Sequence, residues 1–143
     1  MASIVHYGPF DDISRSHPTL NFIEKYCKAI DSLNLASIPA SAFLSPFAIF
    51  HDTKGNVHLT ASHIWQLTAR QAAPFSQIRH DIVEVRLVGN GDGEGRDVVY
   101  CECLAHFRLL GDEDEVLVPS FFCLDRGGGG AWGGHEWEAD SGG

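Results

Sequence analysis

The sequence lacks the features that define several large protein classes. No apolar run approaches the roughly 18 residues that a membrane-spanning helix needs, and residues 1–12 have neither the basic nor the long apolar stretch of a signal peptide. Basic residues are few, since 10 Lys and Arg stand against 19 Asp and Glu, for a formal net charge of −9. This charge opposes binding to nucleic acid and to anionic lipid. We therefore expect a cytoplasmic protein with no nucleic-acid or membrane partner.

The sequence also lacks a cysteine spacing that predicts a metal site. The 4 cysteines lie in apolar segments, and apart from Cys101 and Cys103 no pair stands at ligand spacing. The glycine series 89–95 joins one predicted strand to another and lacks the GxGxxG and GxxxxGK spacings, and neither GxSxG nor HExxH occurs. We expect buried, reduced thiols, no metal and no cofactor.

The composition fits one globular domain. Hydrophobic residues make up 44% of the 143 residues and charged residues 20%, which is close to the average for folded proteins. We expect a single domain over residues 1–126 with a short N-terminal arm over 1–15. Residues 127–143 form a glycine-rich tail with two tryptophans, which is either a last edge strand around Trp137 or a flap over a ligand or partner.

Hydrophobic periodicity predicts two helices and a β-rich second half. Apolar residues at spacings of 3 and 4 predict a helix from Pro18 to about Asn34, and Thr60 or Ser62 can cap a second helix that ends before Pro74. Between them, the pattern predicts a hairpin of residues 47–52 and 57–59. Three long alternating strands follow, over residues 78–88, 98–110 and 116–124.

This order of elements resembles the NTF2-like superfamily, and in particular its SnoaL-like proteins. The resemblance spans residues 18–125 and includes the strand Phe47–Asp52, its glycine turn and the helix with Ile64-Trp65, and the strand SQIRHDIV over residues 76–83. It implies an α+β cone, in which a curved antiparallel sheet wraps around N-terminal helices and encloses a pocket. The superfamily includes polyketide cyclases, dehydratases and isomerases as well as non-catalytic binding proteins, so the resemblance alone does not decide the function.

Strand alternation sorts the polar residues into pocket and exterior candidates. In a strict alternation His80, Ile82, Glu84 and Arg86 share one face of their strand, and Tyr100, Glu102, Leu104, His106 and Arg108 share one face of the next. If these faces line the pocket, imidazole and carboxyl groups there have the types needed for acid–base catalysis. The candidate catalytic residues are His51, Asp52, His80, Glu102 and His106, and the candidate substrate-binding residues are Phe47, Trp65, Tyr100 and Phe121.

The same residues have a structural interpretation, which stays open at this point. Charged residues on these strands, including Glu102 and His106, can form cross-strand pairs on an outer face. Asp52 can cap the turn that follows it, and the aromatic residues can belong to the core. His58 and His63 are expected to be structural or exposed.

Two functions are consistent with these observations. The first is a cofactor-independent cyclase, dehydratase or isomerase that acts on a small hydrophobic intermediate of secondary metabolism, such as a polyketide or terpenoid. The second is a non-catalytic NTF2-like module that binds a small molecule or dimerises. In both cases we expect a homodimer that forms through the outer face of the sheet.

Overall fold

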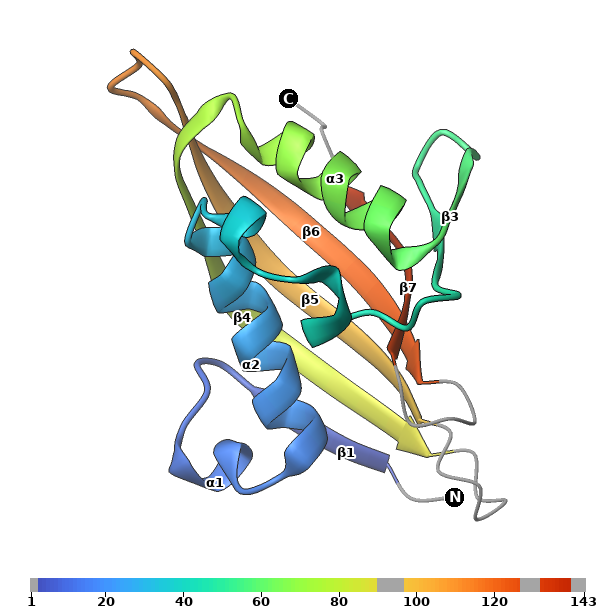
Figure 1. Ribbon diagram of the computed structural model, residues 1–143. Helices are drawn as coiled ribbons and strands as arrows, with labels where there is room; N and C mark the ends of the chain where they lie inside the picture. Colours follow the sequence, from blue (N-terminus) through green and yellow to red (C-terminus); the bar gives the residue numbers. More distant parts are fainter. Residues whose placement is uncertain (1–2, 90–96, 127–131, 140–143) are drawn as a thin grey trace.

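The computed structural model describes residues 3–89, 97–126 and 132–139 (Figure 1). A five-stranded sheet has the order β1-β4-β5-β6-β7, with every neighbouring pair antiparallel. Its strands are β1 (Ser3–Tyr7), β4 (Phe75–Gly89), β5 (Asp97–Leu109), β6 (Glu115–Arg126) and β7 (Trp132–Ala139). The remaining elements are α1 (Asp12–Arg15), α2 (Pro18–Asp31), the 3-10 turns η1 (Leu35–Ser37) and η2 (Ala40–Ala42), the hairpin of β2 (Ile49–His51) and β3 (Val57–Leu59), and α3 (Ala61–Ala72).

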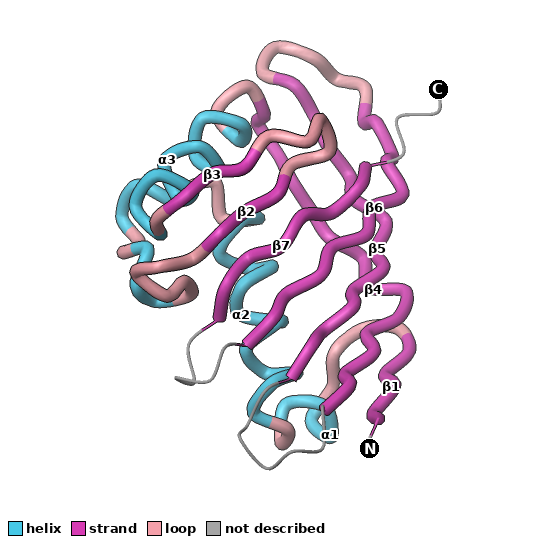
Figure 2. Tube along the Cα trace, turned by 90° about the vertical axis from the view of Figure 1, so that its right-hand side faces the viewer, coloured by secondary structure: helices cyan, strands magenta, loops and turns pink. Residues whose placement is uncertain are grey.

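The helices lie on one face of the sheet. Figures 1 and 2 show α2 and α3 against this inner face, while no helix of the described part covers the outer face. This is the predicted α+β cone with a curved antiparallel sheet, and the prediction is confirmed. None of the helices in the described ranges is long and apolar enough to cross a membrane.

Helix α2 forms where the periodicity predicts it but ends earlier. Pro18 occupies the first turn, and the ring of His17 accepts a hydrogen bond from the Thr19 N–H at 3.3 Å. The helix ends at Asp31 instead of near Asn34, because Leu33 adopts a left-handed conformation with φ of 55°.

Both ends of the chain contribute strands to the sheet. The segment expected as an N-terminal arm contains β1, which pairs with β4, and α1, whose capping box joins Asp11 to Ser14. At the other end β7 pairs with β6. Of the two alternatives for the tail, an edge strand or a flap, the structure therefore shows the edge strand. Residues 127–131 and 140–143 of that tail lie outside the described residues.

A bulge in β4 decides which of its side chains face the helices. Ile82 pairs with Cys103 and Glu84 with Glu102, so Val83 is an extra residue in the ladder. The side chains that face the helices are Ile78, His80 and Ile82 before the bulge, and Val85 and Leu87 after it. Strict alternation therefore fails here. His80 does not share a face with Glu84 and Arg86, which the sequence had placed together.

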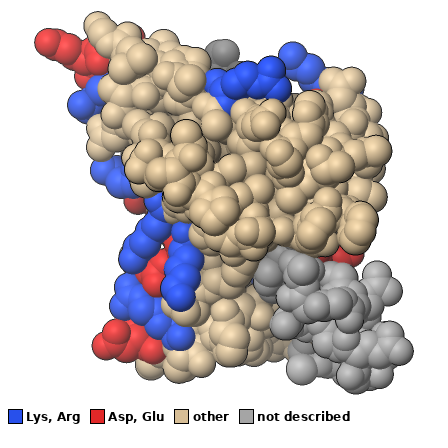
Figure 3. Space-filling model, viewed as in Figure 1, with Lys and Arg blue, Asp and Glu red and all other residues tan. Residues whose placement is uncertain are grey.

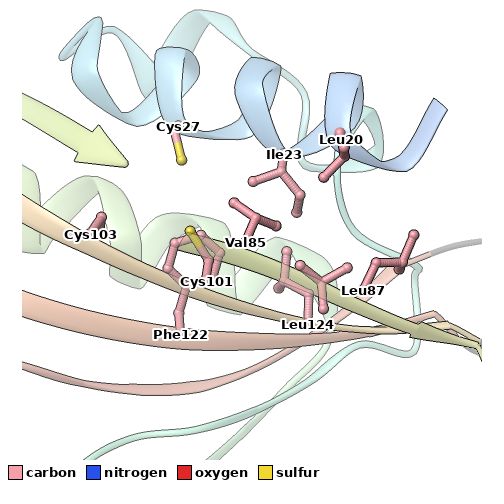
Figure 4. Packing of buried hydrophobic residues seen from close by; sticks show 10 residues of the cluster. Leu20, Ile23, Cys27, Val85, Leu87, Cys101, Cys103, Phe122 and Leu124 are labelled. Carbon is pink, nitrogen blue, oxygen red and sulfur yellow. The ribbon is translucent and has the colours of Figure 1, made fainter. Parts of the chain in front are cut away.

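Two apolar clusters fill the space between helices and sheet. The first packs Leu20, Ile23 and Cys27 of α2 against β4, β5 and β6 (Figure 4). The second surrounds Trp65 of α3, whose indole N–H donates to the carbonyl oxygens of Leu35 at 3.1 Å and Ile38 at 2.9 Å. All four cysteines are free thiols.

We predict that Ile23→Ala destabilises the protein by about 2–5 kcal/mol, because Ile23 is fully buried and its removal leaves a cavity between α2 and the sheet. The measurement is chemical denaturation followed by circular dichroism. Ile13→Ala is the matched control, since Ile13 is 82% exposed and its truncation should change the free energy of unfolding by less than about 0.5 kcal/mol. Equal effects of the two substitutions would contradict this packing.

Candidate active site

A histidine and an aspartate from different elements meet between α2 and β4. Nδ1 of His80 lies 2.5 Å from Oδ1 of Asp31, and the His80 backbone N–H donates to Oδ2 at 3.2 Å. An ionised carboxylate only accepts hydrogen bonds, so Nδ1 carries a proton. When the ring is neutral, Nε2 then has a lone pair, and this atom has no hydrogen-bond partner among the described residues.

The edge of the sheet explains why Asp31 can reach the backbone of His80. Strand β1 pairs with β4 only over Glu84–Val88, and Gly8 donates the last hydrogen bond, to the carbonyl oxygen of Val83. Residues of β4 before Val83 therefore have no strand on this side in the described structure. Asp31, the last residue of α2, accepts the N–H that a neighbouring strand would otherwise take.

The pair lines a hollow of about 320 Å³ at this edge. The wall combines apolar, basic and acidic side chains: Pro9, Phe10, Arg15, Glu24, Cys27, Lys28, Asp31, His80, Asp81 and Ile82. Figure 3 shows Lys and Arg side chains gathered over α2 on this side of the molecule, with acidic side chains among them. This hollow lies at the edge of the cone, beside the apolar clusters that pack between the helices and the sheet.

Two opposing effects act on the His80 ring. Burial lowers the pKa of His80, while the hydrogen bond and the charge of Asp31 raise it, and Cys103 and Asp81 add smaller upward contributions. The net result is a pKa above the ordinary value of 6.5. A histidine with a pKa near the working pH is well suited to take a proton and return it, and the contact with Asp31 strengthens this ring as a base.

His106 and Glu102, two of the predicted catalytic residues, lie on the other side of the sheet. His80 is paired with Ala105 in the ladder, so these two residues share the inner face. His106 follows Ala105 in β5 and therefore points to the outer face, and so does Glu102, four residues before His106. Both ring nitrogens of His106 contact carboxylates: Nδ1 lies 2.5 Å from Glu115 Oε1 and Nε2 lies 2.6 Å from Asp81 Oδ2. For His106 the structure thus shows the cross-strand pairs of the structural interpretation, with Asp81 on β4 and Glu115 on β6.

His51 and Asp52 are also distant from the His80 pocket, because they belong to the hairpin beside α3. Asp52 accepts the N–H groups of Lys54 at 2.9 Å and Asn56 at 2.8 Å, and its Oδ2 lies 3.0 Å from Nε2 of His58. The contact with His58 is the largest of the effects that lower the pKa of Asp52, to about 2. Asp52 therefore caps the turn, and His51 is exposed on β2. The five predicted catalytic residues do not share one cavity.

The predicted substrate-binding residues are dispersed as well. Phe47 is 88% exposed, and Trp65 is buried in the second cluster. Tyr100 and Phe121 stack on each other on the outer face, with ring centroids 6.1 Å apart. None of these four lines the hollow that holds His80.

Asp31 is the residue that the sequence analysis missed. Its only local signal is an unfavourable position, since a carboxylate at the C-terminal end of a helix opposes the helix dipole by about 0.3–1 kcal/mol. The residue that compensates this carboxylate, His80, lies on another element. The sequence does not show that this partner is 49 residues away.

A second hollow, of about 560 Å³, lies between α3 and the η1–η2 segment. Its wall is largely apolar and includes Trp65, Ile38 and Ala69, with Arg70 as its ionisable side chain. It offers no pair of acid and base. Within residues 3–89, 97–126 and 132–139, no group of three or more His, Cys, Asp or Glu side chains is arranged to hold a metal ion.

Comparison with solved structures identifies the fold, whereas comparison of sequences finds no match. No family model matches the chain, and no curated protein sequence matches it. A hexachlorocyclohexane dehydrochlorinase, LinA-type3 from Novosphingobium barchaimii, superposes with a TM-score of 0.68 at 10% identity, covering 91% of each chain. A protein assigned to the scytalone dehydratases, from Novosphingobium aromaticivorans, gives a TM-score of 0.66 at 11% identity over 90% of this chain and 85% of that one.

A third similar structure is a protein assigned to the SnoaL-like polyketide cyclases, from Shewanella denitrificans. Its TM-score is 0.62 at 12% identity, covering 91% of this chain and 92% of that one. The chain therefore has the NTF2-like, SnoaL-like fold that its sequence resembles. At these identities the likeness concerns the fold, and function has to be argued from the site.

We predict that Asp31→Asn lowers the pKa of His80, because the substitution removes the charge that raises it and leaves the burial that lowers it. NMR titration of the His80 ring measures this change. In the wild type the contact stabilises the fold fully below pH 6.5, and this contribution is lost as the pH rises through the higher folded pKa. Asp31→Asn should therefore reduce stability more in acid than in alkali.

The matched control is Asp112→Asn in the exposed turn between β5 and β6. It should leave the titration of His80 unchanged. The titratable groups around His80 are Asp31, Lys28 and Cys27 on α2 and Cys103 on β5, together with Asp81, the next residue of β4, whose carboxylate contacts His106 on the other face. An unchanged pKa of His80 in Asp31→Asn would show that the hydrogen bond does not form in solution.

Proposed function

We propose that the protein is an acid–base enzyme in which Nε2 of His80 removes a proton from a carbon atom of the substrate. The observation that carries the proposal is the His80–Asp31 pair in a hollow large enough for a small organic molecule. Asp31 is a positioning residue, because it fixes the tautomer and the orientation of the ring and stabilises the imidazolium. The comparisons support this class of chemistry, since one similar structure is a dehydrochlorinase and another is assigned to the scytalone dehydratases.

The reaction class that fits one base is an elimination or an isomerisation. In a dehydration, Nε2 takes the proton on the carbon next to a carbonyl group, and the electron pair of the C–H bond becomes the new C=C bond. The hydroxyl group on the following carbon leaves with the proton that the imidazolium returns, so that one water is released and His80 is regenerated. In an isomerisation the imidazolium returns the same proton to another carbon.

The proposed substrate is a small hydrophobic intermediate of secondary metabolism, such as a polyketide or terpenoid. Phe10 and Ile82 give the hollow an apolar part, while His80 supplies the reacting group. The proposed reaction uses the side chains of this chain and no cofactor. Lyases and isomerases of the cyclase, dehydratase or double-bond isomerase type are the corresponding enzyme classes.

The proposal predicts that His80→Asn reduces general-base turnover by about 100-fold or more, because Asn cannot accept the proton. Nitrobenzisoxazole is a suitable probe, since removal of its carbon-bound proton releases a coloured phenolate. His106→Asn is the matched control, because His106 lies on the opposite face of the sheet. Equal rates in His80→Asn and the wild type would contradict the assignment.

The alternative is a non-catalytic module that binds a small molecule or dimerises. The packing of the interior favours it, because in the described part of the chain apolar clusters fill the space between helices and sheet, and His80 lines a hollow at the edge. Binding of the probe without His80-dependent turnover would support this alternative.

We also propose that two copies associate through the outer face of the sheet. This face exposes Tyr100, Leu117 and Phe121, and these apolar residues lie beside charges of both signs. Those charges include Arg79, Asp81, Glu84, Arg86 and Glu102. An isologous interface needs a patch that is complementary to itself, and an apolar centre with both signs of charge around it meets this requirement.

Phe121→Asp should therefore shift the protein toward the monomer, because it places a charge in the centre of the patch. Analytical ultracentrifugation over a concentration series measures the association. Phe47→Asp is the control, since Phe47 is exposed before the hairpin and away from the sheet. A wild type that stays monomeric at every concentration would contradict the proposed dimer.

A further inference from the structure

Lys28 is a cation on the wall of the His80 pocket whose charge is only loosely paired. Its Nζ lies 3.7 Å from Oε2 of Glu24, and its side chain is 70% exposed. Such a long, exposed contact contributes little. Lys28 therefore stays close to the pocket and is available to a ligand.

The neighbouring arginine, in contrast, is fully occupied. Arg15 donates from Nε to Oε1 of Glu24 at 2.8 Å and from Nη2 to Oε2 at 3.0 Å. This two-point contact satisfies both oxygens of the buried Glu24 carboxylate and lowers the pKa of Glu24. Because Arg15 compensates Glu24, the charge of Lys28 is not needed for that purpose.

The other acidic groups of the pocket have partners of their own. Asp31 contacts His80, and Asp81 contacts His106 through Oδ2 and Arg79 through Oδ1 at 3.3 Å. Among the described residues that line this pocket, Lys28 is thus the charged group with the weakest pairing.

The position of Lys28 relative to the His80–Asp31 pair follows from the geometry of helix α2. Residues three apart lie on one face of a helix, about one turn from each other, and Lys28 precedes Asp31 by three residues on α2. Both side chains line the same hollow with His80. A ligand bound in this hollow can therefore contact both His80 and Lys28.

We propose that Lys28 binds an anionic oxygen of the ligand in this pocket. This proposal rests on the proposed function, because it assumes that the reaction takes place beside His80. The anionic oxygen has two sources: a carboxylate that the substrate carries, or the oxygen that becomes negative when His80 removes the proton. A compact ammonium group with three donors fits either oxygen, and such stabilisation of developing charge accelerates proton removal.

The experiment compares Lys28→Gln with Lys25→Gln, which removes an exposed lysine of the same helix that does not line the pocket. Benzoate and its neutral isostere benzamide serve as binding probes, and chemical shifts of the His80 ring and of the pocket amides report their binding. Elimination of nitrobenzisoxazole, which develops a phenolate, reports the second source.

Lys28→Gln is expected to weaken benzoate binding about fivefold, the upper range for an exposed charge pair, and to leave benzamide binding unchanged. A loss of benzoate binding alone assigns Lys28 to a substrate carboxylate. A lower kcat for the elimination with an unchanged KM assigns it to the developing oxyanion. Lys25→Gln should show neither effect.

If Lys28→Gln matches Lys25→Gln in both assays while His80→Asn abolishes elimination, the role of Lys28 is wrong and the proposed function stands. If His80→Asn retains full elimination activity, the proposed function fails, whatever Lys28 does. The two failures are therefore distinguishable.

Discussion

The bulge at Val83 is the constraint on which the rest of the site depends, because it changes the parity of β4 in the middle of the strand. After the bulge, Val85 and Leu87 pack under α2 and form the first apolar cluster. Before it, His80 faces the same helix and meets Asp31. Without the extra residue, a strand with Val85 and Leu87 in the core would turn His80 to the outer face.

His80 and His106 show how position in the sheet determines chemistry. His106 on the outer face has a carboxylate at each nitrogen, so neither nitrogen is available as a base. His80 on the inner face uses only Nδ1 for a carboxylate, and its Nε2 has no hydrogen-bond partner among the described residues. Both residues lie in alternating strands and look equivalent in sequence. Their partners, which come from other elements, make the difference.

Features with a local cause could be predicted from the sequence. Helix α2 follows from its apolar periodicity and Pro18, and the long strands of the sheet follow from alternation. Helix α1 was missed because a four-residue helix has no periodicity and depends on the capping box of Asp11 and Ser14. The order of elements was also sufficient to indicate the NTF2-like cone.

The site depends on relations that alternation and periodicity do not contain. Parity was applied across Val83, so Glu84 and Arg86 were assigned to the wrong face with respect to His80. Asp31 was missed because its partner lies on another element and because Asp at a helix end has no distinctive pattern. Of the five predicted catalytic residues, His80 is the one that the structure places in a hollow with a carboxylate.

The central claim is that Asp31 holds the proton of His80 on Nδ1 and leaves Nε2 as the base. The ¹⁵N chemical shifts of the His80 ring, measured above its pKa, report this tautomer directly. The account predicts a protonated Nδ1 and an unprotonated Nε2 in the neutral ring. A neutral ring protonated on Nε2, or a mixture like that of an exposed histidine, would contradict it.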